Sequence, residues 1–171
     1  GWNNNSFDDT QWSSVTTIPS GYKHLLATYN EPVKKHEVFT AVKMITTPKG
    51  ERVLDFGQNL VGWVKVKASG KAGNNIVIKH AEVLDKFGNF YTDNMRSAKT
   101  TATYILNGQG EEEFEPHFTF YGFRYIKIEG DVAEIKPENF TAVALYSAMP
   151  MSGSFTSSNA LVNQLQQNIQ W

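Results

Sequence analysis

The sequence predicts an all-β, antiparallel fold with one short helix at its C-terminal end. Two observations carry this prediction. Short apolar segments with a two-residue period recur along the chain, and Gly, Asn and Pro punctuate them. A helical period replaces this pattern in the C-terminal tail. Regularly spaced short strands without intervening helices are typical of an antiparallel sandwich or barrel.

Seven segments are predicted to form strands. The first is rich in β-branched residues, and the turn signal Pro48-Lys49-Gly50 separates it from the second. The fifth ends at Asn107-Gly108, a pair that accommodates positive φ angles. The predicted strands cover residues 37–45, 52–56, 63–68, 75–81, 100–106, 121–128 and 140–146.

The predicted strand 121–128 is apolar on both faces, which is typical of a central strand between two packed sheets. Its faces consist of Tyr121, Phe123 and Tyr125 on one side and Arg124, Ile126 and Ile128 on the other. Arg124 therefore points to a half-buried side and needs a partner, because an unpaired buried charge is very costly. Asp55 and Glu82 are the candidates for a structural ion pair with it.

A glycine-bounded segment, residues 57–62 (Gly-Gln-Asn-Leu-Val-Gly), resembles a phosphate-binding loop only superficially. No helix follows it, so the helix N-terminus that would bind phosphate is missing. We expect a tight connection between two strands there, with glycine in a special backbone conformation.

The tail carries the signals of a helix start. Residues 157–159 offer N-cap side chains, and Leu161, Leu165 and Ile169 then recur every four residues. This apolar stripe has no partner helix in the chain. The chain begins at Gly1 and stops inside this predicted helix, so we expect it to be a piece of a longer protein.

Length and charge exclude several classes of function. The chain has 171 residues, 40% of them apolar, so it can build a core. Its 16 Lys and Arg against 17 Asp and Glu give a net charge of −1, which lacks the basic footprint of a nucleic-acid binder. No apolar run approaches the roughly 18 residues of a membrane span. We therefore predict neither nucleic acid nor a membrane as a partner.

The residues also disfavour metal and nucleophile chemistry. Cysteine is absent, which excludes disulfides and thiolate sites. The spacing of the four histidines does not suit zinc, and the Gly-x-Ser-x-Gly and Gly-x-x-x-x-Gly-Lys motifs are missing. We predict no metal and no cofactor. A run of three carboxylates, Glu111–Glu113, is expected to be a solvated turn edge.

The longest connection, residues 82–99, is rich in Asn, Asp and aromatic side chains, and such loops often contact ligands. Its aromatic rings could stack on a sugar while its polar side chains bond the hydroxyl groups, and an aromatic strand face could do the same. The sugar-binding candidates are Trp63, Phe87, Phe90, Tyr91, Asp93, Asn94 and Arg96. The alternative, which we favour, is that these aromatic residues anchor the loop to its own domain or to a neighbouring one.

The order of several motifs closely resembles the bacterial α-L-rhamnosidases from about Lys43 to Trp171. The matching segments are LDFGQNLVGW (54–63), AEVLD (81–85), YILNG (104–108), EPHFTFYGFRY (115–125), GSFTSSN (153–159) and NQL (163–165). The opening residues Trp2, Phe7, Asp8, Asp9 and Trp12 resemble the end of the preceding jelly-roll-type domain of the same enzymes. Each motif is weak by itself, and their order and spacing make the resemblance specific.

The resemblance implies a concanavalin-like β-sandwich, or supersandwich, followed by a catalytic (α/α)6 barrel. It divides the chain into a remnant of the preceding domain or linker (1–20), a β-sandwich accessory domain (21–150) and a linker with the start of a helix (151–171). The catalytic barrel and the preceding domain would be the partners, both within one longer chain.

The parent protein implied by the resemblance is an inverting glycoside hydrolase that releases terminal α-L-rhamnose. In that family both catalytic carboxylates lie in the barrel, so we predict no catalytic residue here and no activity of this segment alone. Asp55, Glu82 and Arg124 match family motif positions and are assigned structural roles. The predicted function is to pack against the barrel and support it. The alternative is a carbohydrate-binding module that contacts rhamnosylated glycans through the 82–99 loop.

Overall fold

The computed structural model describes every residue except Gly1, Ser20 and residues 132–135. The chain divides into two units, Gly1–Asn30 and Glu31–Trp171. The first unit is an extended segment with one short 3-10 helix, η1 (Tyr22–His24). Within it, Phe7 and Trp12 pack edge to face with ring centroids 5.4 Å apart.

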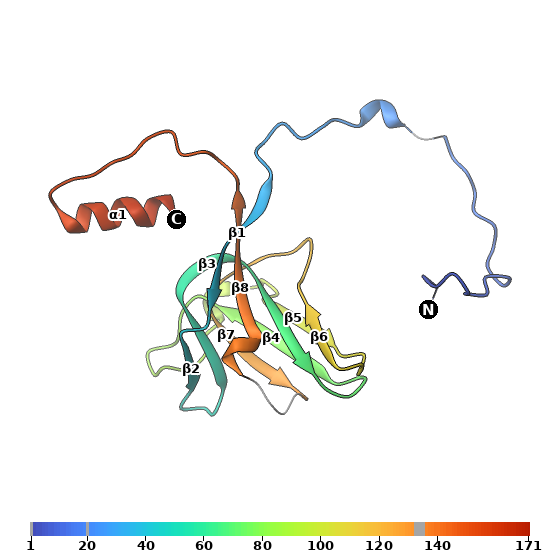
Figure 1. Cartoon of the computed structure of the whole chain (residues 1–171), viewed down its shortest axis with the longest axis horizontal. Helices are drawn as coiled ribbons and strands as arrows, with labels where there is room; N and C mark the ends of the chain where they lie inside the picture. Colours follow the sequence, from blue (N-terminus) through green and yellow to red (C-terminus); the bar gives the residue numbers. More distant parts are fainter. Residues whose placement is uncertain (1, 20, 132–135) are drawn as a thin grey trace. The chain divides into compact units, whose positions relative to one another are not determined.

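The second unit is an antiparallel β-sandwich followed by a helix (Figure 1). Its described strands are β1 (Val33–Thr40), β2 (Lys43–Thr46), β3 (Arg52–Ser69), β4 (Asn75–Ala81), β5 (Thr101–Ile105), β6 (Glu111–Phe114), β7 (Tyr121–Gly130) and β8 (Phe140–Ser147). The remaining elements are two 3-10 helices, η2 (Asp93–Met95) and η3 (Pro137–Asn139), and the helix α1 (Ala160–Gln170).

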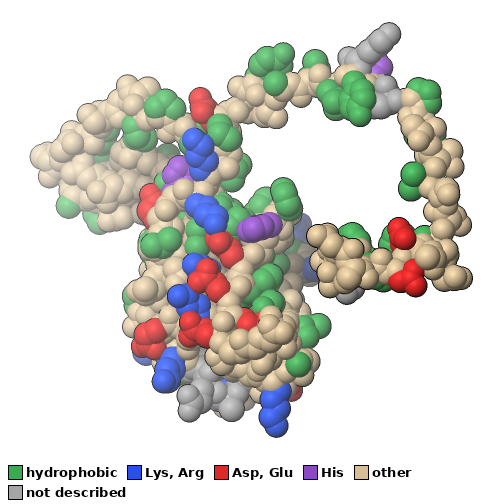
Figure 2. Space-filling view, turned by 45° about the vertical axis from the view of Figure 1, so that its right-hand side comes forward, with side chains coloured by type: hydrophobic (Ala, Val, Ile, Leu, Met, Phe, Trp, Pro, Cys, Tyr) green, Lys and Arg blue, Asp and Glu red, His purple; other side chains and the backbone are tan. Residues whose placement is uncertain are grey.

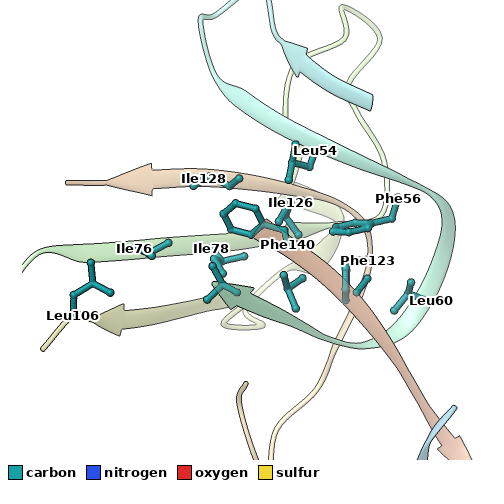
Figure 3. Packing of buried hydrophobic residues seen from close by; sticks show 13 residues of the cluster. Leu54, Phe56, Leu60, Ile76, Ile78, Leu106, Phe123, Ile126, Ile128 and Phe140 are labelled. Carbon is teal, nitrogen blue, oxygen red and sulfur yellow. The ribbon is translucent and has the colours of Figure 1, made fainter. Parts of the chain in front are cut away.

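Strand β3 organises the sheet. The strand order is β1-β8-β3-β7-β4-β5, and β2 and β6 pair with the two ends of β3. The strands curl around one apolar core (Figure 3), since side chains from both halves of β3 meet those of β4, β7 and β8. The buried cluster consists of Leu54, Phe56, Leu60, Val64, Val66, Ile76, Ile78, Leu106, Phe123, Ile126, Ile128, Phe140 and Ala142.

Two strand boundaries differ from the sequence-based expectation. The predicted strand 37–45 divides into β1 and β2, whereas 52–56 and 63–68 are parts of the single strand β3. The break between two strands expected at 57–62 was therefore wrong, whereas the special backbone conformation expected for glycine there is confirmed at Gly57. The pairing of β3 with β7 shifts register between Asp55 and Leu60, and Gly57 has a φ of 77° there. A β-bulge absorbs the extra residues, so the strand continues.

The bulge also explains a correction in β7. Strict alternation places Phe123 and Ile126 on opposite faces, yet both are fully buried in the same core cluster. Asp55 pairs with Tyr125 and Leu60 with Phe123, so Arg124 lies opposite the bulge. The alternation of β7 changes at the residue where its partner strand bulges.

The carboxylate run 111–113 forms strand β6 rather than a solvated turn, which is a second correction. Glu112 is only 8% exposed. Its carboxylate accepts hydrogen bonds from the Tyr104 hydroxyl at 2.6 Å and from the backbone N–H groups of Asn107 and Gly108 at 2.9 and 3.0 Å. These bonds fix the turn between β5 and β6, and they hold the pKa of Glu112 below its ordinary value.

Helix α1 begins as the sequence predicts. The side chain of Asn159 is the N-cap and accepts a hydrogen bond from the Leu161 N–H at 2.9 Å. No described helix is long and apolar enough to cross a membrane.

Candidate interaction surfaces

An ion pair between the buried Asp55 and the half-buried Arg124 links the bulge of β3 to β7. Arg124 donates from Nε and a terminal nitrogen to the two carboxylate oxygens of Asp55, at 2.8 and 2.9 Å. The Gly57 N–H donates to the same carboxylate at 2.7 Å. Burial alone would raise the pKa of Asp55, but these hydrogen bonds more than offset it and hold the pKa below its usual value. Asp55 is therefore a structural acceptor that stays ionised.

Glu82, the other candidate partner of Arg124, contacts the long loop instead. Its carboxylate accepts a hydrogen bond from the Asn94 side-chain amide at 3.2 Å. Because Asn94 lies in η2, this bond ties the middle of the 82–99 loop to the end of β4. Glu82 and Asp55 thus hold two different parts of the domain.

The first half of the 82–99 loop is anchored to the β2–β3 turn. Asp85 accepts hydrogen bonds from the backbone N–H groups of Phe87 and Asn89, both at 2.8 Å. The buried Asn89 side chain accepts from the Lys49 N–H at 3.2 Å. Glu51 accepts from the Phe90 N–H at 3.0 Å. These bonds satisfy the loop within its own domain.

The aromatic residues of this loop differ in how they are covered. Phe90 is half-buried, forms an isolated bridge with Leu84 and has the Lys127 ammonium 5.3 Å from its ring centroid. Tyr91 is also half-buried. Phe87 is 68% exposed. The polar candidates Asp93, Asn94 and Arg96 are exposed as well, so the structure offers one exposed ring there with polar side chains following it in the loop.

Trp63, the remaining sugar-binding candidate, packs within the domain. It is 8% exposed and clusters with Val143 and Leu145 on the outer side of the sheet. Its indole N–H donates to Glu115 at 2.7 Å, and Glu115 also binds the Lys35 ammonium at 2.7 Å. The indole ring is therefore buried and its N–H has a hydrogen-bond partner, so the ring is not exposed for stacking on a sugar.

The surface charges near Trp63 are paired. Lys65 and Lys67 both contact Glu113, at 2.6 and 3.5 Å, and Figure 2 shows Lys and Arg side chains interleaved with Asp and Glu on one face of the sandwich. Exposed pairs of this kind stabilise a fold by only about 0–1 kcal/mol each. Their effect is to leave this face without an excess of positive charge.

An uncovered apolar stripe lies on helix α1. Leu161, Leu165 and Ile169 are 80%, 57% and 70% exposed. At the end of the helix, the Trp171 indole N–H donates to the Asn59 carbonyl at 2.6 Å, and its ring meets that of Phe39 edge to face at 5.7 Å. The helix thus touches the sandwich through its C-cap residue while its apolar stripe remains uncovered.

A second uncovered apolar surface was missed by the sequence reasoning. Phe118 and Phe120, which lead into β7, are fully exposed and 68% exposed. The sequence did contain a signal for this surface: both Phe residues lie outside any predicted strand. Their neighbours His117 and Thr119 are polar. Among the described residues, no group of three or more His, Cys, Asp and Glu side chains could hold a metal ion.

Comparison with known proteins assigns the fold to a family. Residues 45–146, more than half of the chain, match the bacterial alpha-L-rhamnosidase concanavalin-like domain. The chain belongs to this family. The match contains the whole bulge, its Asp55–Arg124 ion pair and the 82–99 loop. The concanavalin-like β-sandwich implied by the motif order is thereby confirmed.

Relatives extend the similarity over the whole chain. A crystal structure of Streptomyces avermitilis alpha-L-rhamnosidase complexed with L-rhamnose is 38% identical, with a TM-score of 0.84. The alpha-L-rhamnosidase structures from Aspergillus terreus and Dictyoglumus thermophilum are 34% and 35% identical, with TM-scores of 0.86 and 0.85. All three alignments cover 100% of this chain but only 17–20% of the other protein. The chain therefore spans about a fifth of the length of its relatives.

Proposed function

We propose that this rhamnosidase domain is a non-catalytic part of a longer α-L-rhamnosidase, in which it packs against the catalytic domain and supports it. The apolar stripe of α1 carries the proposal. A stripe of large apolar side chains left in water is unfavourable by about 25 cal/mol per Å² of apolar surface, and such stripes mark interaction surfaces. The relatives indicate what would cover the stripe. About four fifths of their length lies outside the aligned segment, so a large remainder of the parent chain could pack against it.

The construction of the sandwich supports a scaffold role. Its conspicuous carboxylates are engaged in structural bonds: Asp55 with Arg124, Glu112 with the β5–β6 turn, and Glu115 with Trp63 and Lys35. A glycosidase needs two carboxyl groups across a cleft, one of them free to carry a proton. In this proposal the reaction belongs to the remainder of the parent chain, and segments 1–20 and 151–171 connect the sandwich to its neighbours.

A carbohydrate-binding module remains the competing function. Phe87 and the exposed polar residues of the 82–99 loop are the observations that favour it. Titrating the chain with L-rhamnose would separate the two functions. Saturable NMR shifts confined to residues 87–99 would support the module, whereas no shifts at tens of millimolar sugar would support the scaffold.

The scaffold function is tested with a charge placed on the stripe. In the parent enzyme, Leu165→Asp is expected to lower the melting temperature and the hydrolysis of an aryl α-L-rhamnoside, because the carboxylate would be buried at the contact. The matched control is Gln167→Asp, also exposed on α1 but outside the stripe, and it should change neither quantity. Equal behaviour of the two variants would contradict the proposal.

A further inference from the structure

We propose that residues 115–120, here called the Phe118 segment, form a second docking contact for the remainder of the parent α-L-rhamnosidase chain. The inference rests on the proposed function, because it takes the same parent chain as the occupant. It adds a contact on the sandwich itself, separate in sequence from α1.

The backbone of this segment is strained. Phe118 has a φ of 59°, in the left-handed region that bulky L-residues rarely adopt. Strained residues of this kind persist where the surrounding structure holds them, and they cluster at functional sites. Phe118 therefore has an unfavourable backbone conformation, and Phe is not a residue type that favours positive φ.

The side chain of Phe118 gains little within this chain to offset that strain. It is fully exposed, and its ring lies edge-on to the neighbouring His117 ring with centroids 6.4 Å apart. Phe120 is exposed as well. The strained backbone therefore presents two large apolar rings to water. A second surface that covers these rings would explain why the strain is retained.

Both ends of the segment are held firmly. At its start, Glu115 is bound by the Trp63 indole and the Lys35 ammonium, and Pro116 is buried. At its end, Tyr121 opens β7 and stacks on the buried His80 with ring centroids 4.0 Å apart. The two Phe side chains are thus presented by fixed flanks, which lowers the entropy lost on docking.

One more exposed apolar residue is near the end of this segment in the sheet register. Val61, on β3, is half exposed and pairs with Gly122, two residues after Phe120. Exposed large apolar side chains that lie near one another are typical of interaction surfaces.

The occupant is assigned from length and chemistry. The aligned region is 17–20% of each solved relative, so a large remainder of the same chain is available as a partner. A ring that stacks on a sugar needs polar side chains beside it to bond the hydroxyl groups, and the segment has no run of exposed Asp, Asn and Arg like that at residues 93–96. An apolar recess on the parent chain therefore suits the Phe118 segment better than a carbohydrate does.

Site-specific labelling in the folded parent enzyme tests this contact. Because the chain contains no cysteine, Phe118→Cys places one thiol on the segment, and a maleimide reagent with a peptide-resolved readout measures its accessibility. Phe87→Cys, another exposed Phe on the same sandwich, is the matched control. We expect labelling at position 118 to be about tenfold slower than at position 87, since covered sites react only on opening. After denaturation the two rates should be equal.

Equal rates in the folded parent would overturn the inference. Equal rates, with slowing at position 118 on adding millimolar L-rhamnose, would reassign the segment to the sugar. The variant Leu165→Cys separates this inference from the proposed function. A shielded position 165 with an open position 118 contradicts the Phe118 segment alone, and two open positions contradict both.

Discussion

Two aromatic segments of the same sandwich meet their surroundings in opposite ways. The 82–99 loop has the composition of a ligand-binding loop, yet Asp85, Asn89 and Glu51 tie its first half to the domain, and Phe90 is half-buried. The Phe118 segment has no such composition, yet it presents two exposed rings from a strained backbone.

The difference teaches that aromatic content alone does not identify a binding loop. A loop whose backbone N–H groups are satisfied by its own domain needs no partner, since those bonds already replace water. Both segments contain a non-glycine residue with positive φ, Arg96 in the loop and Phe118 in the segment, and both expose a Phe ring. They differ in that the domain accepts hydrogen bonds from the backbone of the first half of the loop.

The largest expected effect concerns the end of the anchored loop. The N–H and Nδ1 of His80 both bond the Thr100 carbonyl, at 2.9 and 2.8 Å. A carbonyl only accepts, so Nδ1 carries the proton, and Nε2 is buried with no hydrogen-bond partner among the described residues. Burial lowers the pKa of His80 from 6.5 to about 4, the hydrogen bond to Thr100 opposing this only in part.

This pKa predicts acid sensitivity. The unfolded chain binds the proton below pH 6.5 and the folded chain only below about pH 4, so stability falls as the pH drops through this window. The full loss is about 3 kcal/mol. Urea unfolding at pH 7 and pH 4 measures it, and His80→Asn is the control that cannot titrate. If the variant loses as much stability between these pH values as the unsubstituted chain, His80 is not the cause.

A smaller effect is expected from removing an anchor. Glu51→Ala takes the acceptor away from the Phe90 N–H, the Thr47 hydroxyl and the Lys127 ammonium. We expect a loss of about 2 kcal/mol in the free energy of unfolding, because polar groups at half-buried positions lose their partners. Faster hydrogen exchange at residues 85–90 should accompany it.

The exposed Glu111, on strand β6, provides the control for this variant. Glu111→Ala should stay within about 0.5 kcal/mol of the unsubstituted chain. An equally small loss from Glu51→Ala would mean that the 82–99 loop is not anchored as described.

Glycine tests backbone strain in the anchored loop. Gly88 has a φ of 83° and no atom within 4 Å of where a Cβ would lie. Gly88→Ala should therefore destabilise the chain by about 1 kcal/mol through its backbone conformation alone. Thermal unfolding measures the loss. An unchanged melting temperature would show that the loop readily adopts another conformation.

The reverse substitution tests the Phe118 segment. In the isolated chain, Phe118→Gly should stabilise by less than about 1 kcal/mol, since relief of the positive φ exceeds the added flexibility of the unfolded state. In the parent enzyme the same substitution should destabilise, because it removes a docked ring. Phe87→Gly, at a residue without positive φ, should give no stabilisation in either chain. If Phe118→Gly changed the stability of the isolated chain and of the parent enzyme in the same direction, the contrast between the two segments would be lost.

Much of the fold was readable in the sequence because period-two alternation and turn residues are local signals. Strand β4 and the Asn159 cap follow directly from them. Strand β3 was divided in prediction because Gly57 and Gly62 look like breakers, and the Arg124–Asp55 bond that supports the bulge is distant in sequence. Strand β6 was missed because three Glu residues carry no apolar alternation, although Tyr104 and the following turn bury the middle one.

The candidate surfaces were less predictable, since exposure depends on what the rest of the chain covers. Trp63 reads as an outward aromatic residue on a strand, and the Glu115–Lys35 pair together with Val143 and Leu145 covers it. Nothing in the composition around Phe118 indicates a positive φ, because Phe is not a turn former. The stripe of α1 was visible because a helical period is a property of its own residues.

The most direct test of the central claim is the hydrogen exchange of helix α1 in this chain and in the parent enzyme. Exposed as it is here, the helix should exchange rapidly in the isolated chain, since few contacts oppose its local opening. If the remainder of an α-L-rhamnosidase covers the stripe of Leu161, Leu165 and Ile169, residues 160–170 should be strongly protected in the parent. Equally rapid exchange in both proteins would contradict the account.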